Sequence, residues 1–333
     1  MKRVAFIGQK GIPAEFTGTS GVEFYVEQKA KRLVRLGVSV TCYVRSWATP
    51  RAKKTYQGIQ LIHIPTIKTK HFDAFVHSLL SSIHVCFTSV DTVWYQATGP
   101  AFFSLIPKLF GKKIFVTIHA LDWKRDKWGW TARLLLRMAE HTVTHLTNTL
   151  FVVSEDLKTY FRTTYKKETT IDRVTFQPYK KITPDIIAKK YDVHGNDYIL
   201  YLGRFVPEKR IEWLIEAYAK LQPKNVKLIL AGGESNSKQY YAFLQKLTKN
   251  NTNILFTGYV FGKEKQELLT NCRLFVLPSA VEGDPIVIKE LHNNTYVLMS
   301  NELKKTIRNK KHIFTFDTAE KQDFFKKLKA KIQ

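Results

Sequence analysis

The sequence predicts an α/β protein with two domains, each built on a parallel sheet flanked by helices. Segments with strand and helix patterns alternate along the chain, and the alternation restarts after a polar, lysine-rich stretch at residues 180–196. The length of 333 residues is enough for two domains of ordinary size. We therefore expect a first domain over residues 1–180 and a second over residues 181–333.

The first domain opens with a strand, a loop containing several glycines, and a helix. The apolar run Arg3–Ile7 predicts a short buried strand. Ser20 and Glu23 have the spacing of a capping box at a helix start, and Gly37 is placed to end that helix. Val38–Val44 then alternates apolar and polar residues as a strand does. This succession predicts a parallel sheet with right-handed crossovers.

The same alternation of apolar and polar patterns predicts the remaining helices and strands. In the first domain it predicts helices near residues 74–88, 101–110 and 128–147, and strands at Ile59–Ile64, Thr92–Gln96, Lys113–Ile118 and Leu150–Val153. In the second domain it predicts helices near residues 211–221 and 238–249, and strands at Tyr198–Gly203, Val226–Ala231, Ile254–Thr257 and Leu274–Leu277.

Composition excludes several classes of protein. A hydrophobic content of 44% argues against a disordered chain. Three cysteines without CxxC spacing argue against a disulfide scaffold or a zinc module and fit a reducing, cytoplasmic setting. No apolar run reaches the roughly 18 residues needed to span a bilayer, and the start MKRVAFIG leads directly into a strand. We therefore expect a protein that is neither secreted nor transmembrane, although it could lie on a membrane.

The charge is unusual, because 53 Lys and Arg face 28 Asp and Glu and leave a formal net charge of +25. Such an excess favours anionic partners, which could be nucleic acid, an anionic membrane or a phosphorylated substrate. No helix-turn-helix, zinc-finger or RNA-binding signature accompanies the charge, so nucleic acid is the least favoured of the three.

Two loops are candidates for binding a phosphate group. The loop from Gly8 to Gly21 leads into a helix whose free N–H groups can bind an anion, but its spacing is not that of a dinucleotide fingerprint, and an ordinary strand-to-helix loop is the alternative. In the second domain, Arg204 and Lys209 lie between a strand and a helix, where open α/β sheets bind ligands. Their charges suit a diphosphate; two solvated basic residues are the alternative.

A third candidate is the segment from Glu282 to Glu290, which follows a strand and opens a helix at Pro285. The two carboxylates are placed before the helix and two turns along it, so they can accept hydrogen bonds from hydroxyls at two places on an elongated ligand. The alternative is that both merely face solvent, and this is weak for Glu282 in its loop of Gly and Pro.

Together these segments resemble GT-B glycosyltransferases of the family-4 type, with Glu282 and Glu290 as the E-x7-E pattern and Arg204 and Lys209 as the phosphate-binding pair. Other stretches are similar to the bacterial subgroup with L-rhamnosyltransferases of cell-wall and capsular polysaccharide synthesis: IGQKGIPAEF, GVEFYVEQKAKRL, IKTKHFDAFVHSLL, GPAFFSLIPKLFGKK, HALDWKRDKWG and LAGGESNSKQY. The resemblance runs from residue 1 to about 292. It implies two Rossmann-like domains facing a cleft, an acceptor-binding domain followed by a nucleotide-sugar-binding domain.

The resemblance also implies roles for individual residues in a retaining sugar transfer from a nucleotide diphosphate sugar, without a metal or other cofactor. Arg204 and Lys209 would neutralise the leaving diphosphate, Glu290 would hold the ribose, and Glu282 would hold the sugar hydroxyls. The implied donor-binding residues are Gly21, Arg204, Lys209, Glu282, Gly283, Asp284, Pro285, Ile286 and Glu290.

In the first domain the resemblance implies that His119 lies near the reacting carbon and acts with Glu282 in catalysis. Lys10, Asp122 and Trp123 would lie toward the acceptor. Taken without its context, His119 would be an ordinary hydrogen-bonded loop histidine.

The sequence departs from the family pattern at three places. Ala120 replaces a usual glycine, and Tyr179 and Lys180 stand where the linker commonly turns. After about residue 292 the chain is compressed, so we expect a shortened or degenerate end to the second domain. Whether the family's last helix survives as Lys321–Ile332 is left open, as is full activity.

The leading hypothesis is therefore a hexosyltransferase that moves a sugar, L-rhamnose from dTDP-rhamnose, onto a lipid diphosphate-linked saccharide in cell-wall, capsular or exopolysaccharide synthesis. The alternative is a donor-site-impaired paralogue that supports another glycosyltransferase. Glucose, galactose and N-acetylglucosamine remain alternative sugars.

Part of the positive charge also predicts a peripheral position at the inner face of the bacterial plasma membrane. Basic residues flank the apolar run of residues 101–106, and Leu303–Gln333 carries ten Lys and Arg against three Asp and Glu. Such a pattern suits an anionic leaflet, and a generally lysine-rich proteome is the alternative. The flanking residues are Lys68, Lys70, Lys108, Lys112 and Lys113.

Overall fold

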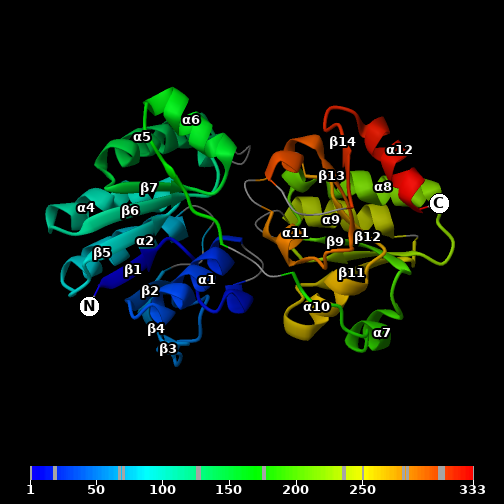
Figure 1. Ribbon diagram of the computed structural model, residues 1–333, viewed down its shortest axis with the longest axis horizontal. Coiled ribbons are helices and arrows are strands. Elements are labelled where there is room, and N and C mark those ends of the chain that lie inside the picture. Colours follow the sequence, from blue (N-terminus) through cyan, green and yellow to red (C-terminus); the bar gives the residue numbers. More distant parts are fainter. Residues whose placement is uncertain are drawn as a thin grey trace. The chain divides into compact units, whose positions relative to one another are not determined.

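The computed structural model describes residues 2–17, 21–66, 69, 72–124, 129–174, 178–234, 238–249, 251–279, 282, 285–306 and 312–332. The chain forms two compact units, Met1–Thr175 and Phe176–Gln333, each with its own sheet and helices (Figure 1). The division lies between residues 175 and 176, and the sequence places the domain boundary at residue 180.

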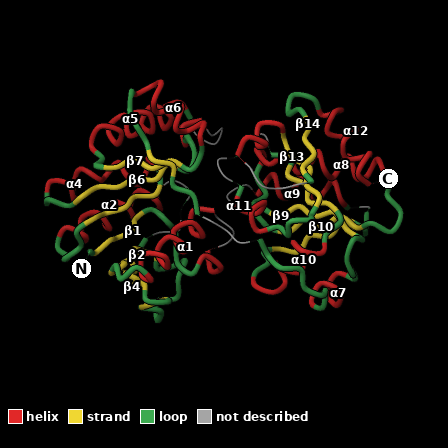
Figure 2. The backbone as a smooth tube through the Cα atoms, in the orientation of Figure 1, coloured by secondary structure: helices red, strands yellow, loops and turns green. Residues whose placement is uncertain are grey.

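The first unit contains a sheet of eight strands in the order β3-β4-β2-β1-β5-β6-β7-β8, and every pairing is parallel except that of β3 with β4 (Figure 2). Its strands are β1 Arg3–Ile7, β2 Ser39–Arg45, β3 Thr55–Tyr56, β4 Ile59–Ile64, β5 Thr92–Gln96, β6 Lys113–Ile118, β7 Thr149–Val152 and β8 Thr170–Ile171. Side chains alternate across the sheet, so that Ala5 and Ile7 join one core cluster and Val4 and Phe6 join another on the opposite face.

Helices cover both faces of the first sheet. They are η1 Ala14–Thr17, α1 Gly21–Arg35, α2 Phe72–Cys86, α3 Thr98–Ala101, η2 Phe102–Ser104, α4 Leu105–Leu109, η3 Asp122–Lys124, α5 Trp130–Leu146 and α6 Glu155–Tyr165. Helix α1 packs on the face with Phe6, whereas α2, α3, α5 and α6 contribute to the cluster with Ile7. The single helix predicted near 101–110 is a succession of short pieces. Ser20 of the predicted capping box lies outside the described residues.

The second unit contains a sheet of six parallel strands in the order β11-β10-β9-β12-β13-β14. The strands are β9 Tyr198–Leu202, β10 Lys227–Ala231, β11 Ile254–Gly258, β12 Leu274–Leu277, β13 Tyr296–Ser300 and β14 Ile313–Phe316. The helices are α7 Ile186–Tyr191, η4 Pro207–Lys209, α8 Ile211–Leu221, α9 Lys238–Thr248, α10 Gly262–Asn271, α11 Ile286–Glu290, η5 Asn301–Thr306 and α12 Lys321–Ile332. Strand β9 is buried along its whole length, as expected for a central parallel strand.

The chain after residue 292, where the sequence predicts a shortened domain, still contributes to this fold. Strand β13 pairs with β12, and β14 pairs with β13. The helix left open at Lys321–Ile332 is present as α12, and it buries Phe324 and Leu328 in the core of the second unit. The sheet therefore continues beyond the E-x7-E segment.

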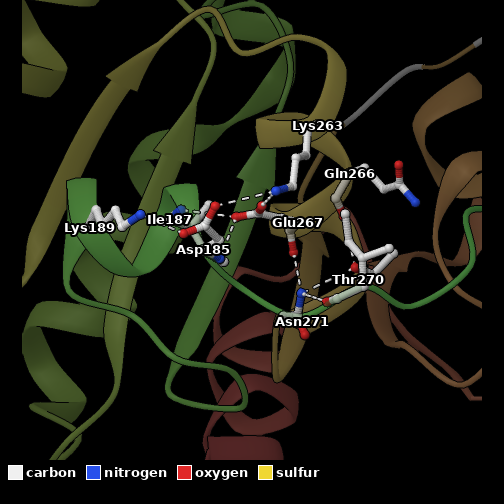
Figure 3. A network of polar contacts seen from close by, with 9 residues as sticks. Asp185, Ile187, Lys189, Lys263, Gln266, Glu267, Thr270 and Asn271 are labelled. Carbon is white, nitrogen blue, oxygen red and sulfur yellow. Dashed lines mark hydrogen bonds and ion pairs between the residues drawn. The ribbon is translucent and has the colours of Figure 1, made fainter.

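The lysine-rich stretch at residues 180–196, predicted to resemble a linker, is packed into the second unit. Ile187 and Val193 are fully buried in its core. The buried carboxylate of Glu267 on α10 accepts hydrogen bonds from the backbone N–H groups of Asp185 and Ile187, at 3.0 and 3.1 Å (Figure 3). Asn271 donates to the carbonyl of Ile182 at 2.9 Å. Side chains from a helix 80 residues further on thus hold a stretch whose own composition is polar.

Replacing Glu267 with alanine should destabilise the second unit by about 1–3 kcal/mol, because the buried N–H of Ile187 would lose its acceptor, and an unsatisfied buried donor costs about that much. The N–H of Asp185 is only partly buried and can bind water instead. Glu267→Gln keeps one side-chain oxygen and should cost less. Urea unfolding of the full chain measures the free energy of unfolding of both variants. Equal losses for the two variants would show that the Glu267 side chain does not stabilise this stretch as a hydrogen-bond acceptor.

None of the helices in the described part of the chain is both long enough and apolar enough to cross a bilayer.

Candidate active site

Two loops at the carboxyl ends of neighbouring strands form the base of the site in the second unit. The loop after β9 and the loop after β10 are joined by hydrogen bonds from Gly203 N–H to the Ala231 carbonyl, at 3.0 Å, and from Phe205 N–H to the Gly233 carbonyl, at 2.9 Å. Gly232 has φ +132°, and a Cβ there would lie 1.8 Å from the Gly203 carbonyl oxygen. Glycine is therefore required for the two backbones to approach this closely.

Arg204 lies on the first of these loops and is half-buried. Its carbonyl accepts a hydrogen bond from the Tyr201 hydroxyl at 3.0 Å. Burial, followed by the charge of Glu282, raises the pKa of Tyr201 well above its usual value of 10.0. The hydroxyl consequently stays protonated, and it fixes the backbone that carries the arginine.

Lys209 and Glu282, predicted from two separate motifs, form an ion pair. Lys209 ends η4, Glu282 follows β12, and the lysine ammonium donates to Glu282 Oε1. Ser279 donates to the same oxygen at 2.9 Å. The two side chains are only 11% and 14% exposed, so the pair is largely shielded from water. This places one cation and one carboxylate together at the carboxyl edge of the sheet.

Three further predicted donor residues, Pro285, Ile286 and Glu290, lie immediately before α11 or on it. Pro285 is buried immediately before the helix, and Ile286 is its first residue. Glu290 is buried at its end, where its carboxylate accepts from Lys265 at 2.7 Å. The two carboxylates of the motif thus pair with different lysines. Gly283 and Asp284 lie outside the described residues.

Tyr179, noted above as a departure from the family pattern, contacts the last residue of α11. Its N–H donates to the carbonyl of Glu290 at 2.9 Å, and its ring packs against the core of the second unit. Burial, together with the Glu290 carboxylate, raises the pKa of Tyr179 to about 12. Tyr179 therefore anchors the end of α11 as a neutral side chain.

In the first unit His119 follows β6 at the carboxyl edge of the sheet. One ring nitrogen, Nε2, lies 2.9 Å from Gln96 Oε1, and the ring packs edge-on against Tyr25 with centroids 4.8 Å apart. The Tyr25 hydroxyl donates to Asp172 at 2.7 Å, and burial, followed by the charge of Asp172, raises its pKa. Sequence reasoning found His119 but missed Gln96, Tyr25 and Asp172, because only the sheet brings these distant positions together.

The residues predicted to face the acceptor are spread over two places in the first unit. Asp122 and Trp123 lie on η3, and the Trp123 ring is 4.3 Å from the guanidinium carbon of Arg137. Lys10 follows β1, and its N–H donates to Glu23 at 2.9 Å. Gly21, the predicted phosphate-facing glycine, begins α1 and is exposed.

A buried polar cluster beside Lys10 escaped sequence reasoning. Arg45, which ends β2, forms an ion pair of 3.2 Å with Asp73, and Trp47 donates to the same carboxylate at 3.0 Å. His77 lies one turn further along α2 and is fully buried, with no hydrogen-bond partner for either ring nitrogen in the described part of the chain. The i, i+4 spacing of Asp73 and His77 within HFDAFVHSLL was the available signal.

His77 should make the protein less stable at acid pH. Burial, with Arg45 as a second cause, lowers the pKa of His77 to about 3. Below pH 6.5 the unfolded chain takes up a proton that the folded chain refuses, so the free energy of unfolding should fall by up to about 1.4 kcal/mol per pH unit between pH 6.5 and 3. Unfolding curves at pH 7.5, 5.5 and 4.5 measure this loss. His77→Leu should reduce its slope, and parallel pH profiles for variant and wild type would contradict the assignment.

No cluster of three His, Cys, Asp or Glu side chains that could hold a metal ion occurs among the residues that the structure describes.

Family models match both units. Residues 19–174 match the model described as Glycosyltransferase Family 4, and residues 183–330 match that described as Glycosyl transferases group 1. The first unit therefore belongs to Glycosyltransferase Family 4 and the second to Glycosyl transferases group 1, and the chain has the GT-B fold. The second match includes the region after residue 292.

Solved structures show the same fold. Sucrose-phosphate synthase from Thermosynechococcus elongatus is similar over 100% of this chain and 91% of its own, with a TM-score of 0.80 and 17% identity. Alr3699/HepE from Anabaena, in complex with UDP and glucose, is similar over 100% of this chain and 90% of its own, with a TM-score of 0.79 and 16% identity.

A curated relative is the uncharacterized glycosyltransferase YqgM of Bacillus subtilis, 27% identical over 200 residues. The match covers 59% of this chain and 53% of YqgM, so the chain spans about half the length of that relative.

Proposed function

We propose that this protein transfers a hexosyl group from a nucleotide diphosphate sugar to an acceptor hydroxyl, with retention at the anomeric carbon and without a metal in the donor site. The observation that carries the proposal is the shielded ion pair of Lys209 and Glu282 beside the Arg204 loop. It lies at the carboxyl edge of a parallel sheet, where α/β proteins bind ligands. A cation for the diphosphate and a carboxylate for sugar hydroxyls are thus available side by side.

The chemistry follows from where negative charge develops. As the bond from the anomeric carbon to the diphosphate breaks, charge accumulates on the leaving phosphate oxygens, and Arg204 and Lys209 would stabilise it. When Lys209 turns toward the diphosphate, Glu282 becomes available to accept from the sugar hydroxyls. Glu290 would accept from the ribose hydroxyls while keeping Lys265 as its counter-ion. His119, held by Gln96, would contact the transferred sugar near its reacting carbon.

The donor we propose is dTDP-rhamnose, and the acceptor is a saccharide linked to a lipid diphosphate in cell-wall, capsular or exopolysaccharide synthesis. This rests on the sequence stretches similar to bacterial rhamnosyltransferases. Among the structural neighbours, Alr3699/HepE of Anabaena is in complex with UDP-glucose, and a TarM mutant of S. aureus is in complex with UDP. UDP-glucose is therefore the main alternative to dTDP-rhamnose as the donor. With a lipid-linked acceptor, the sugar transfer would take place at the inner face of the plasma membrane.

A donor screen tests this proposal. The purified chain is incubated with a lipid diphosphate-linked saccharide and, separately, with dTDP-rhamnose, UDP-glucose, UDP-galactose and UDP-N-acetylglucosamine. Released nucleoside diphosphate and the product mass are measured, and the anomeric configuration is read by NMR. Transfer from dTDP-rhamnose with retention is expected. Transfer from UDP-glucose alone would overturn the sugar but not the activity, and no transfer from any donor would favour the non-catalytic paralogue.

Transfer should persist in EDTA, because Arg204 and Lys209 supply the positive charge that a divalent ion supplies elsewhere. Initial rates with millimolar EDTA, roughly a thousandfold above a micromolar trace of metal, should stay within about twofold of those without it. Loss of activity that added Mg²⁺ or Mn²⁺ restores would show that the donor site needs a metal.

A further inference from the structure

Helix α2 is reversed with respect to an ordinary amphipathic helix of a water-soluble protein. Its buried side is mainly polar and contains Asp73, His77, Ser78, Ser81 and Ser82. Its outward side is mainly apolar: it contains Phe72, Phe75, Leu80, Ile83 and Phe87, beside the exposed His84. Phe87 directly follows the helix and is 78% exposed. A helix bordered by water normally turns its polar side outward. The outward side of α2 is therefore composed for an apolar environment.

Neighbouring helices extend this apolar side. The Phe75 ring packs against Phe103 of η2 with centroids 4.8 Å apart, and Phe87 packs against Phe110 after α4 at 5.8 Å. Exposed apolar residues continue over η2, α4 and α5. We call the following residues the apolar face: Phe72, Phe75, Leu80, Ile83, Phe87, Phe102, Leu105, Leu109, Phe110, Trp130, Leu134, Leu135 and Met138.

This concentration is confined to the first unit. In the described part of the second unit, the exposed large apolar residues are Phe243, Tyr259 and Tyr296, from three separate elements. Scattered exposed apolar residues are ordinary, whereas a contiguous set on adjacent helices marks a surface that is covered by something.

The charges around the apolar face indicate what covers it. The acidic residues of α2, α4 and α5 are Asp73 and Glu140, and both are buried. The exposed charges on α5 are Arg133 and Arg137, and Lys113 is exposed at the start of β6. An apolar face bordered by cations, without an exposed carboxylate on its helices, is complementary to anionic lipid. Two copies of this face would bring like charges together, which disfavours self-association.

Two of the lysines that the sequence predicts at the membrane surface have other partners in the structure. Lys112 donates to the carbonyls of Thr88 and Val90, at 2.7 and 2.8 Å, and Lys108 donates to the carbonyl of Leu146. The ammonium groups of Lys108 and Lys112 thus hold the end of α5 and the loop before β5, and the arginines of α5 lie beside the apolar face instead. Lys68 and Lys70 lie outside the described residues.

We propose that the apolar face of α2, η2, α4 and α5 is the surface by which this protein lies on an anionic bilayer. The aromatic and leucine side chains enter the boundary between headgroups and acyl chains, and Arg133, Arg137 and Lys113 contact the phosphates. The proposal deepens the proposed function, since a lipid-linked acceptor lies in that boundary. Binding to vesicles nevertheless requires no sugar donor, so the two can fail separately.

Flotation of the full chain with vesicles of phosphatidylcholine, with and without 30% phosphatidylglycerol, gives the basic measurement, where roughly that content of acidic lipid gives a strong surface potential. Wild type should float with the anionic vesicles. The variants Phe87→Glu/Leu109→Glu and Leu134→Glu/Leu135→Glu should bind at least about tenfold more weakly, because each places carboxylates among the headgroups. All four side chains are exposed, so folding should be retained.

Two controls each add one glutamate elsewhere, and the double variant Leu36→Glu/Phe243→Glu carries the same charge change as the apolar-face variants. Leu36→Glu lies in the first unit after α1, and Phe243→Glu lies on α9; both positions are exposed and outside the apolar face. Both should float like wild type. Equal weakening by the controls, undiminished flotation of the apolar-face variants, or absence of wild-type flotation would overturn the proposal. So would a wild-type dimer that these variants convert to monomer in light scattering, since a second copy would then cover the face. Nucleotide release in detergent is measured in parallel and should be unchanged in every variant.

Discussion

Replacing Lys209 with alanine should lower the turnover number of sugar transfer by roughly 10²–10³-fold, about 3–4 kcal/mol in the activation barrier, if the proposed donor site is correct. The ammonium of Lys209 is shielded and placed beside the loop of Arg204, where it would stabilise charge that develops on the leaving diphosphate. Arg204→Ala should give a loss of the same order. The turnover number and KM for the donor are measured with saturating acceptor.

Loss of Lys209 leaves the largely buried Glu282 carboxylate without its counter-ion, so the substitution should also destabilise the protein. Thermal unfolding of each variant therefore accompanies the kinetics, and only a variant that is folded at the assay temperature counts. Lys224→Ala removes an exposed lysine from the loop before β10, at the opposite end of the strands, and should leave turnover unchanged. A folded Lys209→Ala protein with wild-type turnover would show that the ion pair is purely structural.

Replacing Gly232 with alanine should destabilise the second unit by about 3 kcal/mol or more, from the sum of an unfavourable backbone conformation and overpacking. At φ +132° the new Cβ would lie 1.8 Å from the Gly203 carbonyl oxygen and 2.9 Å from its carbon, and both contacts are with backbone that cannot turn away. The loops after β9 and β10 would have to separate, which moves Arg204. We expect a fall of roughly 6–12 °C in the unfolding temperature of this unit and reduced donor binding.

Gly258 provides a matched control for the steric part of this argument. Its carbonyl accepts from Gly232 N–H at 2.8 Å, its φ is +71°, and an added Cβ would meet no atom within 4 Å. Gly258→Ala should therefore cost only the conformational part, about 1–2 kcal/mol. If both variants lost the same stability, the close approach of the two loops would not be the cause.

The sequence predicts most of the architecture because strands and amphipathic helices are set by local periodicity. Arg3–Ile7, Ile59–Ile64, Thr92–Gln96, Lys113–Ile118 and Leu274–Leu277 are strands with the bounds that their apolar patterns predict. The elements it missed have weak or misleading local patterns. Helix α7 lies in a polar, lysine-rich stretch whose backbone is held by Glu267 and Asn271, far along the chain.

The candidate site likewise has features that the sequence predicts and features that only the structure shows. Arg204, Lys209 and Glu282 could be selected from the sequence, since charged residues in loops after predicted strands fall at the ligand-binding edge of a sheet. That Lys209 pairs with Glu282 while Glu290 pairs with Lys265 could not be selected, because an ion pair depends on which loops the sheet order makes adjacent. The contact of His119 with Gln96 and Tyr25 likewise depends on β5, β6 and α1 meeting in space.

The sequence by itself determined two α/β units, the family to which they belong and the loops that carry the charged residues, because these follow from local periodicity and from spacing along the chain. Only the tertiary structure decided which charges neutralise one another and which side of α2 faces outward. Local periodicity marks α2 as amphipathic, and the orientation follows only when the sheet and Arg45 occupy its polar side, leaving Phe72, Phe75 and Phe87 exposed. Three of the 53 basic residues, Arg133, Arg137 and Lys113, border that exposed side of the first unit.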